Sequence, residues 1–223
     1  MQAYFDKVRD YAKGPRFPKD LSYEAMIPYV DGAAPIIFRV RNVDSIRAAI
    51  EFGQKNKVRF AVEGADDAWR IASEVKKAGV TVILNPAGRS TLSANNPVND
   101  WDPYDTPYAV PYLLHKAGIP FCFTAGGTSE AMSLPFRVGT HLAYGLPWDA
   151  AIKSLTETPA RLFGVQESCG TLKVGMQANF IVVAGDPLEP SSNVRYVFMD
   201  GKPASLVNRQ TMLRDKYWAR LKQ

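Results

Sequence analysis

The chain has 223 residues, 46% hydrophobic and 22% charged, which is the composition of an ordinary globular protein with a sizeable core. Its formal net charge is +5, but basic and acidic residues are interleaved, so no basic stripe indicates a nucleic-acid partner. No window is apolar over a membrane-spanning length, and residues 1–14 lack an apolar signal core. The sequence therefore predicts no membrane partner and a cytoplasmic location if the chain is complete; for a fragment of a longer precursor the location stays open.

Two helices are predicted before the first strand. Phe5 and Val8 recur at helical spacing, and Gly14 follows as a stop signal. After a linker that contains prolines, a second, short helix is expected, with Ser22 as its candidate cap and a break at Pro28.

The next part of the chain alternates between apolar, β-rich runs and amphipathic helices. Four strand-then-helix units in series predict parallel strands with right-handed crossovers, and so an α/β fold. The predicted strands are 35–40, 58–63, 80–86 and 119–125, and the predicted helices are 42–56, 67–79, 108–118, 134–145 and 147–164.

The character of the sequence changes after Gly164. Short β runs with the turn signals Gly-Asp-Pro and Asp-Gly follow, and an amphipathic helix ends the chain. We therefore predict a βα region over 1–164, a small β segment over 165–207 and a C-terminal helix over 208–223. Cys122, in an apolar run, is expected to be a buried thiol, and nothing supports a disulfide.

The β segment and the helix before it carry a family resemblance. The matching pieces are Gly145-Leu146, Thr156 to Ala160, Gly170 to Gly175, Ala178-Asn179 and Gly185 to Leu188. Together they closely resemble the C-terminal signature of the amidohydrolase superfamily, most strongly its imidazolonepropionase-like members; only Asn179 departs from the usual Asp. The resemblance implies that the four βα units are half of a (β/α)8 barrel and that the β segment belongs to a small composite sandwich. It also implies hydrolysis of non-peptide C–N bonds.

The resemblance further implies a metal site that this chain does not complete. Relatives activate water on zinc or iron held at the C-terminal ends of the barrel strands. By the resemblance, Arg39 or Arg41 stands where a histidine of strand five belongs, Gly64 lies near the position of a strand-six histidine, and Gly126 replaces the strand-eight aspartate. We therefore predict no metal cofactor and assign no catalytic residue. The prediction is an amidohydrolase-like chain without a functional metal site; the alternative is a non-catalytic binding or assembly module of the same fold.

The remaining candidate ligands do not restore this site. His115 and His141 both fall in predicted helices, away from the strand ends. Glu63 ends a strand, but one carboxylate does not hold zinc. We favour an ion pair between Glu63 and either Arg39 or Arg41 on the neighbouring strand.

A small-molecule ligand, if there is one, is expected at the C-terminal strand ends. An arginine-lined mouth suits a carboxylate or phosphate better than a cation. The loop that carries Asp100, Asp102 and Asp105 lacks the glycine and terminal glutamate of an EF-hand loop, so we interpret it as a cap over the mouth. The candidate ligand-binding residues are Arg39, Arg41, Glu63, Arg89, Tyr104 and Thr124.

Four βα units also predict a partner. They leave two sheet edges and an apolar face that a closed barrel would cover. We expect a homodimer or higher oligomer; a complementary N-terminal polypeptide is the alternative.

Overall fold

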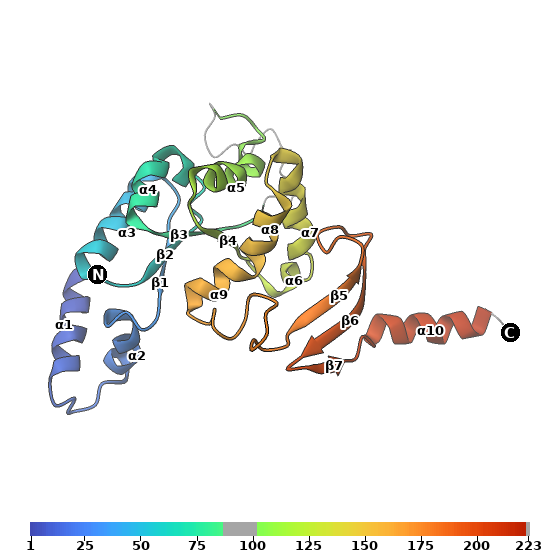
Figure 1. The fold of residues 1–223 in the computed structure, drawn as a ribbon. Coiled ribbons are helices and arrows are strands. Elements are labelled where there is room, and N and C mark those ends of the chain that lie inside the picture. Colours follow the sequence, from blue (N-terminus) through green and yellow to red (C-terminus); the bar gives the residue numbers. More distant parts are fainter. Residues whose placement is uncertain (87–101, 222–223) are drawn as a thin grey trace.

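The computed structural model describes residues 1–86 and 102–221 (Figure 1). Its first half contains α1 (Gln2–Lys13), α2 (Leu21–Val30), β1 (Ile36–Arg39), α3 (Val43–Asn56), β2 (Phe60–Glu63), η1 (Ala68–Ile71), α4 (Ala72–Ala78), β3 (Thr81–Leu84), α5 (Thr106–Ala117) and β4 (Phe121–Phe123). Its second half contains α6 (Thr128–Ala131), α7 (Leu134–Gly139), η2 (Thr140–Tyr144), α8 (Trp148–Leu155), α9 (Glu157–Phe163), β5 (Phe180–Ala184), β6 (Asn193–Met199), β7 (Lys202–Ala204) and α10 (Arg209–Leu221).

Strands β1 to β4 form one parallel sheet in the order β1-β2-β3-β4. Each pair of neighbours is joined by a crossover that contains a helix, as the alternation of strand and helix patterns predicted. The predicted α/β class is therefore confirmed. Parallel strands place all their C-terminal ends at the same edge of the sheet, which is where α/β proteins usually bind ligands.

The two faces of this sheet are packed differently. One face carries Val62, Val82 and Phe121, which belong to the main hydrophobic core together with residues of the surrounding helices. On the other face, Ile83 and Cys122 form a smaller cluster with Ala61 and with Leu162 of α9. This second face is the one expected to be bare, but these strand residues are buried; exposure is confined to the β1 edge, where Ile37 is 40% exposed.

The second helix, α2, differs from the prediction in its cap and in its length. The cap of α2 is Asp20 and not Ser22, because the Asp20 carboxylate accepts hydrogen bonds from the backbone N–H groups of Ser22 (2.8 Å) and Tyr23 (3.2 Å). The helix also continues past Pro28 to Val30. A proline near the end of a helix removes one backbone bond, and the bond at the C-terminal cap, from Asp31 N to Ile27 O, is still made at 3.1 Å.

Three segments predicted as single helices are each divided. Residues 67–79 form the 3-10 turn η1 followed by α4, residues 134–145 form α7 followed by the 3-10 turn η2, and residues 147–164 form α8 and α9. The last of these divisions falls at Thr156, whose backbone is not helical (φ −129°, ψ −77°). The Thr156 side chain donates instead to the backbone oxygen of Ile152 at 2.8 Å, a local bond that competes with continuation of the helix.

The C-terminal β segment is an antiparallel sheet in the order β5-β6-β7. It is attached to the helices through the residues after β5. Leu188 is 2% exposed within the main core, and Trp148 Nε1 of α8 donates to both carboxylate oxygens of Asp186 at 3.0 Å. Asn179 also has a structural role, since its side-chain oxygen accepts from Asp200 N at 2.8 Å across the sheet.

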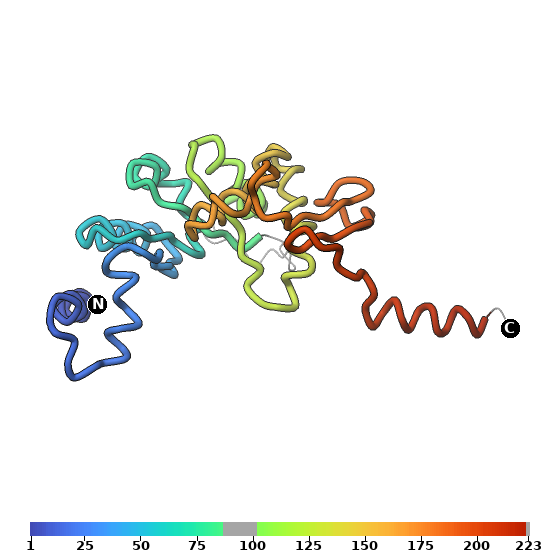
Figure 2. Tube along the Cα trace, turned by 60° about the horizontal axis from the view of Figure 1, so that its bottom comes forward, coloured from blue at the N-terminus to red at the C-terminus, as the bar shows by residue number. Residues whose placement is uncertain are grey.

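Helix α10 projects away from the rest of the molecule, at the end opposite to the N-terminus (Figure 2). None of its residues is buried. Among the described residues, no helix has the length and apolarity required to span a bilayer. Both cysteines are free, and burial raises the pKa of the Cys122 thiol to about 12, as expected for an unreactive buried thiol.

Candidate functional site

The C-terminal ends of β1 and β2 carry an ion pair. Arg39 and Glu63 are direct partners in the parallel register, and Arg39 Nε donates to Glu63 Oε2 at 3.1 Å. The Glu63 side chain is 21% exposed, whereas that of Arg39 is 86% exposed. The pairing favoured from the sequence is therefore present, with Arg39 as the partner. Among residues 1–86 and 102–221, Arg39 is engaged only through Nε, so its terminal amino groups face solvent there.

The other candidate residues are dispersed along the same edge. Arg41 is exposed, and its backbone N–H donates to Ser45 Oγ at 3.0 Å, which helps to cap α3. Thr124 follows β4, and its hydroxyl accepts from Gly126 N at 3.3 Å. Tyr104 is 62% exposed. Arg89 lies outside the described residues. The structure thus brings only Arg39 and Glu63 into contact.

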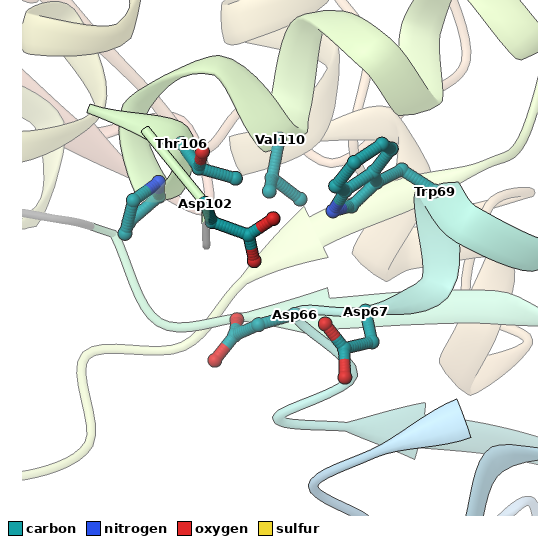
Figure 3. Close-up of a pocket in the computed structure, with 7 residues that line it drawn as sticks. Asp66, Asp67, Trp69, Asp102, Thr106 and Val110 are labelled. Carbon is teal, nitrogen blue, oxygen red and sulfur yellow. The ribbon is translucent and has the colours of Figure 1, made fainter. Parts of the chain in front are cut away.

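A crevice beside these strand ends escaped the sequence analysis. It lies between the loop after β2 and the first turn of α5, and its volume is about 10 Å³, enough for one water molecule. Three carboxylates surround it, with Trp69 at one side (Figure 3). Its lining consists of Asp66, Asp67, Trp69, Asp102, Thr106, Pro107 and Val110. The signal in the sequence was the acidic pair directly after a strand and a glycine, but the proximity of Asp102 depends on tertiary structure.

Arg70 joins the two loops that form the crevice. Its Nε donates to Asp67 Oδ1 at 3.1 Å, and its Nη2 donates to Asp102 Oδ2. The Asp67 and Asp102 side chains are 9% and 7% exposed, so this bridge is largely buried. Asp66 lines the crevice but is not bound by Arg70. Burial, with a smaller contribution from the charge of Asp67, raises the pKa of Asp66 to about 6.

The buried histidine, His141, lies in the core and not at the strand ends. It is fully buried and stacks against Phe123, with ring centroids 5.3 Å apart. Its Nδ1 lies 2.9 Å from the backbone oxygen of Tyr108, and because a carbonyl only accepts, Nδ1 carries the proton. Nε2 has no hydrogen-bond partner among the described residues. Burial is the main cause that lowers the pKa of His141, and nearby Arg137 lowers it further.

The donor set at the strand ends does not fit the metal ion implied by the resemblance. Glu63 is the one carboxylate within strands β1 to β4, and it is engaged by a guanidinium. The carboxylates of the loop after β2, Asp66 and Asp67, line the crevice, where Arg70 binds Asp67. Over residues 1–86 and 102–221, no group of three or more His, Cys, Asp or Glu side chains is arranged to hold a metal. The described residues therefore do not form the metal site that the resemblance implies.

Comparison with known proteins supports the resemblance. Residues 106–205 match the amidohydrolase family. The chain is 25% identical over 190 residues to amidohydrolase tasK of Hapsidospora irregularis, covering 82% of this chain and 19% of that protein. It is 27% identical over 141 residues to N-acetylglucosamine-6-phosphate deacetylase of Caenorhabditis elegans, covering 61% of this chain and 30% of that protein.

A solved structure extends the likeness in fold. The crystal structure of an amidohydrolase from Thermotoga maritima MSB8 superposes with a TM-score of 0.76 at 21% identity, covering 92% of this chain and 54% of that one. The chain therefore spans about half of this structural neighbour and less than a third of the two curated relatives. Residues 106–205 therefore match the amidohydrolase family in sequence, and most of the chain resembles an amidohydrolase in fold.

Proposed function

We propose that this chain forms one half of an amidohydrolase-type (β/α)8 barrel and that its own strand ends do not support metal-dependent hydrolysis. The family chemistry, hydrolysis of a non-peptide C–N bond, then requires groups outside the described residues. The observation that carries this proposal is the ion pair between Arg39 and Glu63, which occupies the strand ends where the resemblance expects metal ligands.

A complementary partner follows from the same proposal. Four parallel strands with β1 and β4 at the edges are half the number that closes such a barrel. The β5-β6-β7 sheet also exposes apolar side chains, with Ile181 at 52%, Tyr196 at 60% and Met199 at 63%. We propose that a homo-oligomer or a separate polypeptide covers these surfaces, because an apolar sheet open to water favours association.

A second candidate function, a non-catalytic binding module, is supported by the open guanidinium of Arg39. Glu63 holds Nε and so orients the terminal amino groups toward solvent at the mouth. An oriented guanidinium matches the geometry of a carboxylate or phosphate. In this candidate function the strand ends bind a small organic anion and leave it unchanged.

Hydrolysis and binding can be separated by experiment. The purified chain is incubated with a panel of N-acetyl amines, cyclic amides and imides, with and without added zinc, and products are measured by mass spectrometry. We expect no hydrolysis above the buffer background. Zinc-dependent turnover that Glu63→Gln abolishes would contradict the proposal. For the second candidate, calorimetry with small carboxylates should give binding that Arg39→Gln removes and that Arg195→Gln, at an exposed arginine of β6, leaves intact.

The assembly has its own test. Sedimentation equilibrium at micromolar concentration should give a mass above the 24.7 kDa of one chain. A homogeneous monomer would refute self-association.

A further inference from the structure

The backbone at two strand ends adopts a conformation that side chains rarely take. Gly64, directly after β2, has φ +74°, and Gly126, after β4, has φ +75°. In this left-handed region a residue with a Cβ is strained, which makes glycine the usual occupant. By the resemblance, Gly126 replaces a metal ligand and Gly64 lies near the position of another.

Space is also restricted at Gly64. An ideal Cβ on this residue would lie 2.9 Å from the backbone oxygen of Val40. Val40 is fixed in place, because its N–H donates to the backbone oxygen of Glu63 at 2.9 Å. To relieve the contact between this Cβ and the Val40 oxygen, the chain after β1 would have to shift relative to β2. At Gly126 the nearest atom is the side-chain oxygen of Asn85, at 3.2 Å, so backbone strain is the main obstacle there.

The end of β1 adds an electrostatic obstacle. A divalent cation at Glu63 would have to displace the guanidinium of Arg39 or lie beside it, and like charges a few ångströms apart repel each other. The partly buried carboxylate already has its counter-ion. The guanidinium of Arg39 therefore supplies the positive charge beside Glu63 that a bound metal ion would supply.

We infer that the geometry and charge of these strand ends exclude a metal ion. Two backbone conformations that favour glycine, at Gly64 and Gly126, and the Arg39–Glu63 ion pair stand where metal ligands would be needed. Restoring single ligand side chains should then fail to create a metal site. This inference concerns the same strand ends as the proposed function but does not depend on hydrolysis. The inference is tested by metal binding and thermal stability, whereas the proposed function is tested by turnover. Either one can therefore fail while the other holds.

The metal test uses the full chain after chelator treatment. Native protein, Arg39→His, Gly64→His and the double variant are each dialysed against micromolar zinc, and bound zinc per chain is measured by elemental analysis. We expect substoichiometric zinc in all four. One equivalent of zinc in the native chain that Glu63→Gln removes would overturn the inference, whereas zinc that Glu63→Gln leaves in place is bound elsewhere and agrees with it.

The backbone strain is tested with alanine variants, whose smaller side chain is less disruptive to folding than histidine. Gly79, the cap of α4, also has a left-handed backbone (φ +66°), but an added Cβ would meet nothing within 4 Å. Gly79→Ala is therefore the matched control for backbone strain alone. We expect it to lower the unfolding temperature by about 4 °C, and Gly64→Ala to lower it by roughly twice as much. Equal shifts, or a stable Gly64→His variant that binds one zinc, would overturn the inference.

Discussion

Arg39 and Glu63 are partners in the β1–β2 register, and their side chains form an ion pair in which Arg39 Nε lies 3.1 Å from Glu63 Oε2. The parallel register favours this ion pair, because it places both side chains on the same face at the same level of the sheet. The ion pair is therefore a consequence of the strand alignment and needs no loop to arrange it.

The pair should contribute little to stability, because the Arg39 side chain is 86% exposed. Chemical denaturation of Arg39→Gln, Glu63→Gln and the double variant gives the coupling between the two side chains. We expect a coupling free energy below about 1 kcal/mol, the range of exposed ion pairs. A much larger value would mean that the pair is a structural element of the sheet.

Arg70 should matter more than its surface counterpart Arg47. Arg70 bridges Asp67 and Asp102, whose side chains are at most 9% exposed. Arg47 contacts Glu74, and both of those side chains are about half exposed. We expect Arg70→Ala to cost about 2–4 kcal/mol of unfolding free energy, because it leaves Asp67 without its cation.

Arg47→Ala, the matched control, should cost much less, because its ion pair with Glu74 is exposed to solvent. Urea denaturation measures both variants. Equal costs would show that the bridge between the two loops is not a stabilising feature.

Asp66 should make the protein less stable at neutral pH than at acidic pH. Its pKa is raised to about 6, above the value near 4 expected in the unfolded chain. The folded state therefore holds the proton more tightly, and this contribution is complete below pH 4 and lost as the pH rises through 6.

Asp66→Asn should accordingly raise the unfolding free energy at pH 7.5 by about 1–2 kcal/mol, with no gain below pH 4. Asp10→Asn, at an exposed carboxylate of α1, is the control and should change little. A loss of stability in Asp66→Asn at pH 7.5 would contradict the assigned burial of this group.

His141 should make the protein less stable at acidic pH than at neutral pH, the opposite of the effect of Asp66. Its pKa is lowered by burial, so the folded state favours the neutral ring. Its stability contribution is present above the unfolded pKa of about 6.5 and is lost as the pH falls below it. His141→Asn keeps a donor for the Tyr108 carbonyl but does not titrate, so this loss should disappear.

The measurement is best made in the Asp66→Asn background, since Asp66 titrates over the same range with the opposite sign. Stability is followed from pH 7.5 to pH 5. His115→Asn, at an exposed histidine, is the control. If the pH dependence survives His141→Asn, a different group causes it.

Leu188 should hold the C-terminal sheet to the helices. It is 2% exposed, whereas Leu172 in the same segment is 80% exposed. Leu188→Ala should cost about 2–4 kcal/mol, the usual range for a buried leucine. Leu172→Ala should stay within about 0.5 kcal/mol. Limited proteolysis should cleave Leu188→Ala faster around residues 185–192 than the native chain, and an unchanged pattern would argue against this anchoring role.

Local sequence patterns predicted the four strands, the helices between them and the parallel order of the sheet. Apolar alternation and turn residues act over a few positions and are read directly from the chain. The sequence also predicted that Glu63 pairs with an arginine at the end of the neighbouring strand, either Arg39 or Arg41, and the strand register selects Arg39. Local signals were less reliable at helix ends: Asp20 displaced Ser22 as the cap, and Thr156 divided a predicted helix.

Contacts between residues far apart in the sequence depend on the tertiary fold. Asp102 reaches Arg70 because the chain returns over the loop after β2, and no local pattern specifies that return. The burial of His141 between α5 and β4 likewise depends on how helices pack against the sheet. The left-handed backbone at Gly64 could be suspected from a glycine after a strand, but the Val40 oxygen that blocks a side chain there is a neighbour in space. Local structure follows from short-range backbone preferences, whereas burial, ion-pair networks and steric exclusion arise where segments far apart in the sequence come into contact.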